Sequence, residues 1–566
     1  MMKKSSMTHL LFLVLFWLAT HALFAVAEAK DHVYLQQNWT EKDRQYFYFT
    51  DQGSRLLPYD YFLHLEQADN NQLFRSDNNL LRFGLIPTQK SQKNPDGLPI
   101  GFARNRDYLG PTCAACHTQQ ITYKKHVMII DGGQTLFDLQ KFLSELTLSL
   151  KVTLEDTDKF TRFQRHLLGE KASEKKKAQL KLALTNEYQK RQAYSIENHT
   201  EVPYGYGRLD AFGAILNRAL VATGEKSNTN PPNAPTSYPY LWDTPQHDYV
   251  EWNGSQSNSN IGAFARNIGE VIGVFGDIET NTTHWLGFID GGYKSSIQTQ
   301  ELRRLEKVVG RLHSPQWPAQ LPSINKALAK QGRTLYERHC ISCHLDISRT
   351  DPKRMIQVRM STLGEIKTDS LMASNAIFYK GKSGKLEGKP RYYVVGEPLP
   401  KIAPAIDIAN NFMVGIIKNN PLQAYLAQRD AQRFGHGDEI HPPKYVDGKI
   451  IESGQEVSQR ALLAYKARPL NGVWTSAPFL HNGSVPNLYQ LLLPAKNRVK
   501  QFYLGSMEFD SKHVGFEMVQ VRESFLFDTT LPGNSNGGHE YGAGYGNVPA
   551  LTENERWALI EYLKTL

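Results

Sequence analysis

Two stretches of the chain carry apolar residues at helical spacing and predict helices that pack in a core. The first follows an Asp-Gly-Gly turn at 131–133, which itself follows a short strand-like run at 128–130. Its apolar positions are Leu139, Phe142, Leu143, Leu146 and Leu150. Those of the second stretch are Ile261, Phe264, Ala265, Ile268, Ile272 and Phe275. Side chains three and four residues apart share one helix face, so each stretch presents an apolar stripe.

A third helix is expected at 324–336, and a fourth closes the chain. Thr552 and Glu555 form a capping-box pair before the closing helix. Its apolar face contains Trp557, Leu559, Ile560 and Leu563. Gly332 lies just before a cysteine motif, where a side chain of one hydrogen allows two helix backbones to approach closely. We therefore expect these two helices to cross at Gly332.

The lysine-rich stretch 171–191 is interpreted as a solvated helix face, and the proline-rich stretch 231–245 as an irregular segment. Arg266 and Glu270 are four residues apart and have the spacing of a helical ion pair.

The N-terminus has the layout of a secretory signal. Lys3 and Lys4 precede an apolar run at 10–19, and small residues follow at Ala25, Ala27 and Ala29. The run is shorter than the ~20 apolar residues that span a bilayer. We therefore expect residues 1–27 to be cleaved, no transmembrane anchor to remain, and the mature protein to be periplasmic or secreted.

Composition indicates an ordinary globular protein. Of the 566 residues 40% are hydrophobic and 11% aromatic, which excludes wholesale disorder. The formal net charge is +9, but acidic and basic residues are spread along the chain and no basic arm is present. We therefore expect no nucleic-acid partner.

All four cysteines lie in two C-x-x-C-H patterns, which are typical of covalent c-type heme attachment. The patterns run from Cys113 through Cys116 to His117, and from Cys340 through Cys343 to His344. Two thiols one helical turn apart project to the same side and can bond the two vinyl groups of one porphyrin, and the histidine is then the proximal iron ligand. The sequence therefore predicts two covalent c-type hemes.

Zinc and structural disulfides are the alternatives. Paired C-x-x-C motifs that bind zinc are usually separated by about 15–20 residues, far fewer than lie between Cys116 and Cys340.

The fold class expected is mainly α, with two cytochrome c-like heme domains, large loop-rich insertions and few short strands. Prolines near residue 320 predict the boundary, giving an N-terminal heme domain at 28–320 and a C-terminal one at 321–566. The first domain is divergent, because Gly110 and Pro111 exclude a helix directly before Cys113.

Several stretches resemble the di-heme cytochrome c peroxidase superfamily, and most closely the rubber-oxygenase-like di-heme cytochromes. They are 112–118, 241–245, 252–254, 266–270 and 477–485. That superfamily includes peroxidases fed by small cytochromes, an enzyme that matures a tryptophan-derived cofactor, and polyisoprene dioxygenases; related enzymes oxygenate unsaturated fatty acids. The resemblance implies an N-terminal heme with an open face for dioxygen or hydrogen peroxide, and a six-coordinate C-terminal heme that transfers electrons.

The sixth ligand of the C-terminal heme has several candidates. His539 resembles the distal histidine region of the rubber oxygenase branch, and the glycines before it allow its imidazole to reach the iron. The alternatives are His481, Met355, Met360 and Met372.

The distal cover of the N-terminal heme is expected from the aromatic segment and the helix after it. The candidate catalytic residues are Trp252, Asn253, Phe264 and Arg266, with Phe275 as a further cover residue. Phe264 and Phe275 also fit a core role, and Arg266 also fits a heme propionate.

Three functions remain open. One is a heme-dependent oxygenase of an unsaturated lipid or isoprenoid, which is the leading hypothesis. The second is a peroxidase that reduces hydrogen peroxide with electrons from a small redox protein. The third is a non-enzymatic di-heme electron carrier, against which the large insertions around the first heme argue.

Overall fold

The computed structural model describes residues 31–285, 289–436, 445–446, 449–450 and 463–566. The predicted signal segment at 1–27 therefore lies outside the described residues, as do the first residues of the expected mature chain, 28–30. Helices make up 39% and strands 17% of the structure, and the strands form many small sheets. The strands are short but more numerous than the sequence indicated. The two-domain cytochrome c-like fold stays a prediction, because these proportions do not decide it.

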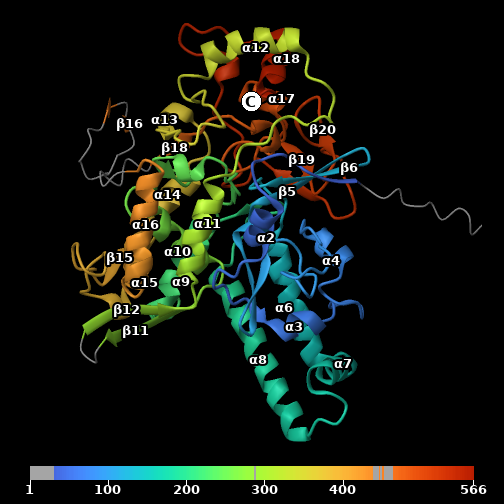
Figure 1. Ribbon diagram of the computed structural model, residues 1–566, viewed down its shortest axis with the longest axis vertical. Helices are drawn as coiled ribbons and strands as arrows, with labels where there is room; N and C mark the ends of the chain where they lie inside the picture. The colour runs from blue at the N-terminus through green and yellow to red at the C-terminus, as the bar shows by residue number, and fades with distance from the viewer. Residues whose placement is uncertain (1–30, 286–288, 437–444, 447–448, 451–462) are drawn as a thin grey trace, which may run out of the picture.

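One group of elements surrounds the first cysteine motif and includes the long helices at the bottom of Figure 1. Its helices are α2 (Glu41–Phe49), α3 (Tyr59–His64), α4 (Asp77–Arg82), α5 (Cys113–Cys116), α6 (Leu139–Glu155), α7 (Thr157–Leu168) and α8 (Glu174–Glu197). Its strands are β1 (Asp31–Tyr34), β2 (Leu57–Pro58), β3 (Phe102–Asn105), β4 (Tyr108–Pro111), β5 (Thr118–Tyr123) and β6 (His126–Asp131). They form two three-stranded sheets, in the orders β1-β6-β5 and β2-β4-β3.

A second group, at the left of Figure 1, packs helices from both halves of the chain together. Its helices are α9 (Ala211–Ala222), α10 (Gly262–Gly273), α11 (Thr299–Val309), α14 (Leu371–Phe378), α15 (Ala405–Lys418) and α16 (Pro421–Arg433). Its short elements are β7 (Arg208–Leu209), β8 (Thr236–Ser237), η1 (Thr244–Gln246), β9 (Tyr249–Val250), β10 (Gln256–Ser257), β11 (Ile278–Trp285), β12 (Ile289–Ser295), β14 (Lys380–Lys382), η2 (Gly384–Leu386) and β15 (Ile402–Pro404).

The third group, at the top of Figure 1, surrounds the second cysteine motif. Its helical elements are α12 (Lys326–His339), α13 (Leu363–Ile366), η4 (Val473–Thr475), α17 (Leu488–Leu491), η5 (Ala495–Asn497), η6 (Tyr541–Ala543) and α18 (Glu553–Leu563). Its strands are β13 (Arg359–Thr362), β16 (Tyr445–Val446), β17 (Lys449–Ile450), β18 (Ala464–Ala467), β19 (Gln501–Leu504), β20 (Phe509–Asp510), β21 (Gly515–Phe516) and β22 (Phe525–Asp528).

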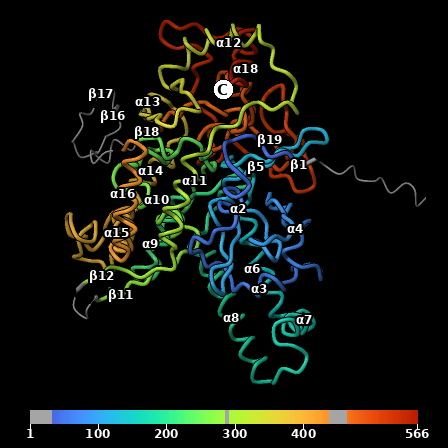
Figure 2. Tube along the Cα trace, viewed as in Figure 1, coloured from blue at the N-terminus to red at the C-terminus, as the bar shows by residue number. Residues whose placement is uncertain are grey.

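The hydrophobic cores join residues from both sides of position 320. The largest cluster runs from Leu35 in the N-terminal half to Leu566 at the C-terminus. A second cluster joins Phe264 of α10 to Phe412 of α15. Figure 2 shows β5, from the N-terminal half, beside segments from the C-terminal half, and Thr122 of β5 forms a bridge with Glu508, just before β20. The boundary at 320 stays a prediction, and the halves on either side of it are packed together.

Most of the expected elements are present. The strand run at 128–130 lies in β6, and the apolar stripe after it is the buried face of α6. The second stripe forms α10, which ends at Gly273, so Phe275 lies beyond the helix with a positive φ of 75°. Most of the lysine-rich stretch lies in α8 and is exposed, but Arg191 near its end is buried.

The first cysteine motif is positioned by a sheet rather than by a preceding helix. Gly110 and Pro111 lie in strand β4, so a strand and not a helix comes before Cys113, as the sequence predicted. Gly101 has a φ of +89°, and a Cβ at that position would lie 2.1 Å from the backbone nitrogen of Ala115. A glycine at 101 therefore allows this sheet to contact α5 directly.

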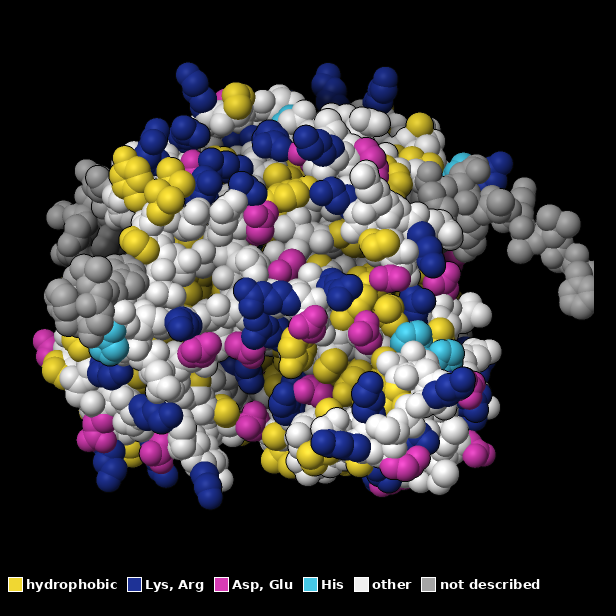
Figure 3. All heavy atoms as spheres, turned by 60° about the horizontal axis from the view of Figure 1, so that its bottom comes forward, with side chains coloured by type: hydrophobic (Ala, Val, Ile, Leu, Met, Phe, Trp, Pro, Cys, Tyr) yellow, Lys and Arg dark blue, Asp and Glu magenta, His cyan; other side chains and the backbone are white. Residues whose placement is uncertain are grey.

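Charges are mixed over the surface. Figure 3 shows acidic and basic side chains interspersed over one face, with apolar side chains between them. No field of a single sign covers this face.

Helices α12 and α18 cross as the sequence predicted. Thr552 and Glu555 form the capping box that begins α18. A Cβ on Gly332 would lie 2.0 Å from the carbonyl oxygen of Ala558 and 2.7 Å from Cβ of Tyr562. The helices therefore pack backbone to backbone at Gly332.

Replacing Gly332 with alanine is expected to lower the free energy of unfolding by about 1–3 kcal/mol, the usual effect of overpacking a close contact. Gly364→Ala in α13 is the matched control, because the nearest atom to its added Cβ is 4.0 Å away. Chemical denaturation of both variants measures the difference. Equal stability of the two would contradict the close crossing.

Candidate functional site: two heme-attachment centres

Cys113 and Cys116 begin and end α5, one helical turn apart. The side chain of Thr112 caps the helix by accepting from the backbone of Ala114. The Cys113 thiol donates to Oε1 of Gln52 at 3.1 Å. Burial raises the pKa of both thiols to about 12. None of the four cysteines forms a disulfide in the structure.

His117 is oriented by a backbone carbonyl. Its Nδ1 lies 2.7 Å from the carbonyl oxygen of Pro239. Because a carbonyl can only accept, Nδ1 carries the proton and the lone pair is on Nε2. Burial lowers the pKa of His117 to about 4, so the ring is neutral at pH 7. A neutral imidazole fixed in this way is the form that binds a metal.

A large cavity lies next to His117. It contains about 1530 Å³ of empty space, part of it open to solvent. Both thiols of the first motif and His117 line it. The two thiols and the histidine thus face one shared space, as a porphyrin joined to both cysteines would require.

The structure brings two of the four candidate catalytic residues to this cavity. Trp252 and Arg266 line it. Asn253 is fully buried outside the lining, with its Nδ2 unpartnered among the described residues. Phe264 belongs to the hydrophobic cluster between α10 and α15. Phe275 is also buried in a core, beside helix α8.

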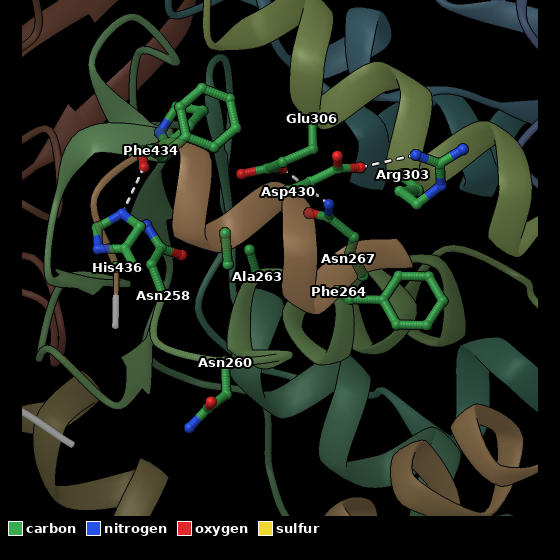
Figure 4. Close-up of a pocket in the computed structure, with 13 residues that line it drawn as sticks. Asn258, Asn260, Ala263, Phe264, Asn267, Arg303, Glu306, Asp430, Phe434 and His436 are labelled. Carbon is green, nitrogen blue, oxygen red and sulfur yellow. Dashed lines mark hydrogen bonds and ion pairs between the residues drawn. The ribbon is translucent and has the colours of Figure 1, made fainter. Parts of the chain in front are cut away.

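Arg266 forms its ion pair across helices rather than along α10. Its Nη2 lies 2.8 Å from Glu306 of α11, so the pair with Glu270 that the spacing allowed is not formed. The reason is that α11 packs against α10 and brings Glu306 over Arg266. Asn267 also donates to Glu306, at 2.9 Å. Figure 4 shows Asn267 and Glu306 at a smaller pocket of about 390 Å³, which Phe264 also lines.

Glu270 is a site residue that sequence reasoning missed. It lines the cavity, and burial, reinforced by the charge of Glu251, raises its pKa to about 8. The carboxyl group is therefore protonated at neutral pH. The signal for Glu270 in the sequence was its spacing of four residues from Arg266, and that spacing predicted an ion pair along the helix rather than a place in a cavity.

Lys466 and Arg468 place two basic side chains at the same cavity. Lys466 lies in β18 and Arg468 follows directly after this strand, and both residues line the cavity. Burial lowers the pKa of Lys466 well below its ordinary value, and burial also lowers the pKa of Arg468. No motif in the sequence marked either residue.

Arg468 connects the first centre to the second. Its Nη2 donates to the Tyr240 carbonyl at 2.9 Å, and its guanidinium lies 3.6 Å from the centre of the Tyr240 ring. The carbonyl oxygen of Arg468 lies 2.6 Å from Nδ1 of His344. His344 is thus held by a backbone carbonyl in the same way as His117.

His539 faces His344. The two ring centres are 6.1 Å apart. Burial, together with the neighbouring His344, lowers the pKa of His539 to about 3, and its Nδ1 has no partner among the described residues. Metal bonds to histidine nitrogen are about 2.0–2.1 Å long, which makes the separation suitable for one iron between two imidazoles. His539 has a φ of +48° and follows Gly538, so a tight turn directs it inward.

The alternative sixth ligands lie elsewhere. His481 stacks on Tyr465 with ring centres 4.0 Å apart, and its ring centre is 6.5 Å from that of Trp252. Met360 is buried beside Gly254. Met355 lies next to Gly435 and is exposed, and Met372 lines the cavity of the first centre.

Both centres fit a covalently attached heme. Each has two thiols, a neutral histidine oriented through Nδ1, and buried surroundings. Over the described ranges there is no cluster of three or more His, Cys, Asp or Glu that would hold a bare metal ion. None of the helices in the described part of the chain is long and apolar enough to cross a bilayer.

Comparison with protein families matches one short segment of the chain. A family described as "RoxA-like, cytochrome c-like" matches residues 464–503, the segment that contains Arg468 and His481. A cytochrome c-like domain of this kind implies covalently bound heme and heme oxidoreductase activity, and is typically periplasmic or extracellular. It supports a relationship to the rubber-oxygenase-like cytochromes.

Two proteins of Sinorhizobium fredii are similar over much longer stretches. The uncharacterized protein y4iJ is 31% identical over 599 residues, covering 94% of this chain and 93% of y4iJ. The uncharacterized protein y4iM is 25% identical over 393 residues, covering 64% of this chain and 73% of y4iM. This chain, with its RoxA-like cytochrome c segment, therefore belongs to the same protein family as y4iJ.

Proposed function

We propose that this protein is an exported di-heme oxidoreductase in which the heme at Cys113, Cys116 and His117 activates an oxidant. The heme at Cys340, Cys343 and His344 transfers electrons, with His539 as its sixth ligand. The leading function is oxygenation of an unsaturated lipid or isoprenoid with dioxygen. Heme iron supplies the binding and reduction of dioxygen or peroxide at the first centre.

An open face at the first centre supports this division. In the described part of the chain, the residues lining its cavity include no histidine besides His117, whereas His344 has His539 opposite. Among the described lining residues, Met372 is the one methionine. An iron with one protein ligand can bind an external oxidant, and an iron with two must first lose one.

The observation that carries the oxygenase function is an apolar pocket beside the first centre. It contains about 440 Å³ of empty space between α9, α10 and α15. Its apolar lining consists of Phe212, Ile215, Leu216, Ile406, Ala409 and Met413. At its other end it shares Arg266 and Glu270 with the heme cavity. An apolar chain that enters past the half-buried Ile215 and Ile406 thus reaches the distal side.

The buried carboxyl of Glu270 favours a second candidate function, reduction of hydrogen peroxide. Glu270 holds a proton on its carboxyl oxygen at pH 7 and can donate it to an oxygen atom in the cavity. Arg266 cannot do so, because a guanidinium keeps its proton and here is paired with Glu306. Glu270 is therefore the acid at this site.

A short chain of contacts supports electron transfer between the centres. His117 contacts the Pro239 carbonyl, the next residue Tyr240 accepts from Arg468, and the Arg468 carbonyl contacts His344. The Tyr240 and Trp242 rings stack 4.4 Å apart beside this chain. Each proximal histidine is thus one hydrogen bond from the connection.

The function is tested by anaerobic purification, followed by dioxygen, peroxide and an unsaturated lipid added in turn. Optical and electron-paramagnetic spectra follow each heme. Lipid oxidation products formed with dioxygen support the oxygenase, and peroxide turnover with a reduced small cytochrome supports the peroxidase. Two hemes that respond to neither oxidant, even when half-reduced, would leave only an electron carrier.

His539→Ala is expected to abolish the low-spin bis-histidine signal of the C-terminal heme, because the iron loses its second imidazole. His481→Ala is the matched control, a buried histidine that stacks on Tyr465 instead. Electron-paramagnetic resonance of the oxidised protein measures both. The His539 assignment is wrong if its variant keeps the signal or if the control loses it.

Glu270→Gln is expected to lower peroxide turnover about 10²- to 10⁴-fold, the usual range for loss of a general acid. Because the active form is protonated, wild-type turnover should fall as pH rises through about 8, and the variant should lose that limb. Steady-state kinetics across pH measure this.

The exposed Glu279→Gln in β11 is the control for a carboxyl outside the cavity. Unchanged heme spectra in both variants show that attachment is intact. An unaltered pH profile in Glu270→Gln would remove Glu270 from the mechanism.

Ile406→Trp is expected to fill the mouth of the apolar pocket and reduce lipid oxidation at least tenfold, while peroxide turnover stays within about twofold of wild type. Ile402→Trp adds the same indole to an exposed position nearby and should change neither rate. Product analysis with the two substrates distinguishes the outcomes. Equal loss of both activities would argue against a separate apolar route.

A further inference from the structure

A further cavity lies beside residues 275–277, next to the loop after α10. It contains about 780 Å³ of empty space and is lined by α8, α9 and the loop after α10. Val274 lines the heme cavity and Phe275 lines this one, so a single turn of chain separates the two. Its charged lining residues are Arg55, Lys190, Arg191 and Arg218, with Glu187, Glu197 and Asp277.

Two of these charges are neutralised by neighbours. Nζ of Lys190 lies 2.7 Å from Glu187, and Nη1 of Arg55 lies 2.9 Å from Asp277. These pairs leave Arg191 and Arg218 opposite Glu197.

Arg191 is buried without a counterion. Its residue is 9% exposed, and neither its Nε nor its Nη1 has a hydrogen-bond partner among the described residues. The guanidinium lies 4.9 Å from the centre of the Phe275 ring and makes a cation–π contact with it. The ring has no oxygen or nitrogen to accept an ordinary hydrogen bond. A buried guanidinium with unused donors is destabilising unless an anion meets it.

Arg218 places a second unused donor in the same cavity. Its Nε is buried and has no partner, and its Nη2 reaches the Gly276 carbonyl only at 3.4 Å. Like charges held close together repel, and burial, with a smaller contribution from the charge of Arg218, lowers the pKa of Arg191. The two side chains therefore concentrate positive charge at one point.

Glu197 does not neutralise the pair. It forms no ion pair with either arginine among the described contacts, and the four basic side chains of the lining outnumber its three acidic ones. The cavity thus has an excess of positive charge and unsatisfied N–H donors.

We propose that the pocket formed by Arg191 and Arg218 binds the oxyanion group, a carboxylate or a phosphate, of a ligand. Guanidinium groups present paired N–H donors whose spacing matches two oxygens of such a group. Phe275 forms the apolar floor beneath it.

The position of the pocket indicates where the rest of a longer ligand would lie. Tyr194 lines this pocket and also a neighbouring cavity of about 720 Å³. That cavity shares Leu139 and Leu209 with the heme cavity. An anionic head at Arg191 and Arg218 would leave an attached chain directed into this neighbouring cavity, which shares no lining residue with the apolar pocket between α9, α10 and α15. The oxyanion site therefore does not rest on the proposed oxygenase function.

The test is binding to the purified holoprotein by titration calorimetry with three probes: inorganic phosphate, dodecanoate and dodecanol. We expect dodecanoate to bind and dodecanol not to bind. Arg191→Met, which keeps the apolar stem over Phe275, and Arg218→Gln should each weaken binding about tenfold or more, as for loss of a charge-assisted hydrogen bond. Lys175→Gln, an exposed position on α8, is the matched control and should bind as wild type.

Phosphate separates the two sources of the oxyanion. Binding of phosphate as well as dodecanoate identifies a site for free oxyanions, and binding of dodecanoate alone identifies a site for the head of an amphipathic ligand. Equal binding of dodecanol, absence of binding by both anions, or unchanged affinity in the arginine variants would overturn the proposal. None of these measurements needs turnover, so they are independent of the oxygenase assay.

Thermal stability provides a second test, because a purely structural role for Arg191 predicts the opposite effect of its replacement on unfolding. In buffer free of oxyanions, Arg191→Met should be at least as resistant to thermal unfolding as wild type, because an unpaired buried charge has been removed. Wild type should become the more stable of the two when dodecanoate is added. A variant that is less stable without any anion would assign Arg191 to the fold.

Discussion

The arrangement of both centres depends on two backbone carbonyls that hold two histidines. Pro239 and Arg468 accept from Nδ1 of His117 and His344 at 2.7 and 2.6 Å. These bonds fix the tautomer of each ring, so that the lone pair lies on Nε2. Both carbonyls belong to irregular or edge segments, because a carbonyl within a helix or a paired strand is already occupied. The proline-rich stretch 231–245 is therefore a structural requirement of the first centre.

The sequence predicted the parts of the structure that local patterns specify. The cysteine motifs, the capping box of α18 and the close approach at Gly332 each follow from a few neighbouring residues, and the structure places them as expected. His539 was selected among several candidates, and it is the histidine that faces His344. Glycines around it signalled a tight turn.

The rest of the site depends on contacts between distant segments, for which the sequence has no local signal. Arg266 pairs with Glu306 because α11 packs on α10, and Glu270 is thereby left without the partner that helical spacing offers. Asn253 and Phe264 occupy buried positions outside the cavity for the same reason: adjacent residues on a loop or helix face different surroundings. Lys466 and Arg468 come from more than two hundred residues beyond the first motif and carry no motif of their own.

The same long-range packing explains why one cavity can combine acidic, basic and apolar walls. The thiols come from the N-terminal group of elements, Glu270 from α10, and Arg468 from the segment after β18. The hydrophobic clusters that fix these segments also cross residue 320. Because each wall is fastened to a different part of the chain, neither half contains a complete first centre. The protonated carboxyl of Glu270 and the basic side chains of Lys466 and Arg468 are thus brought to one cavity by the assembled fold rather than by any single element.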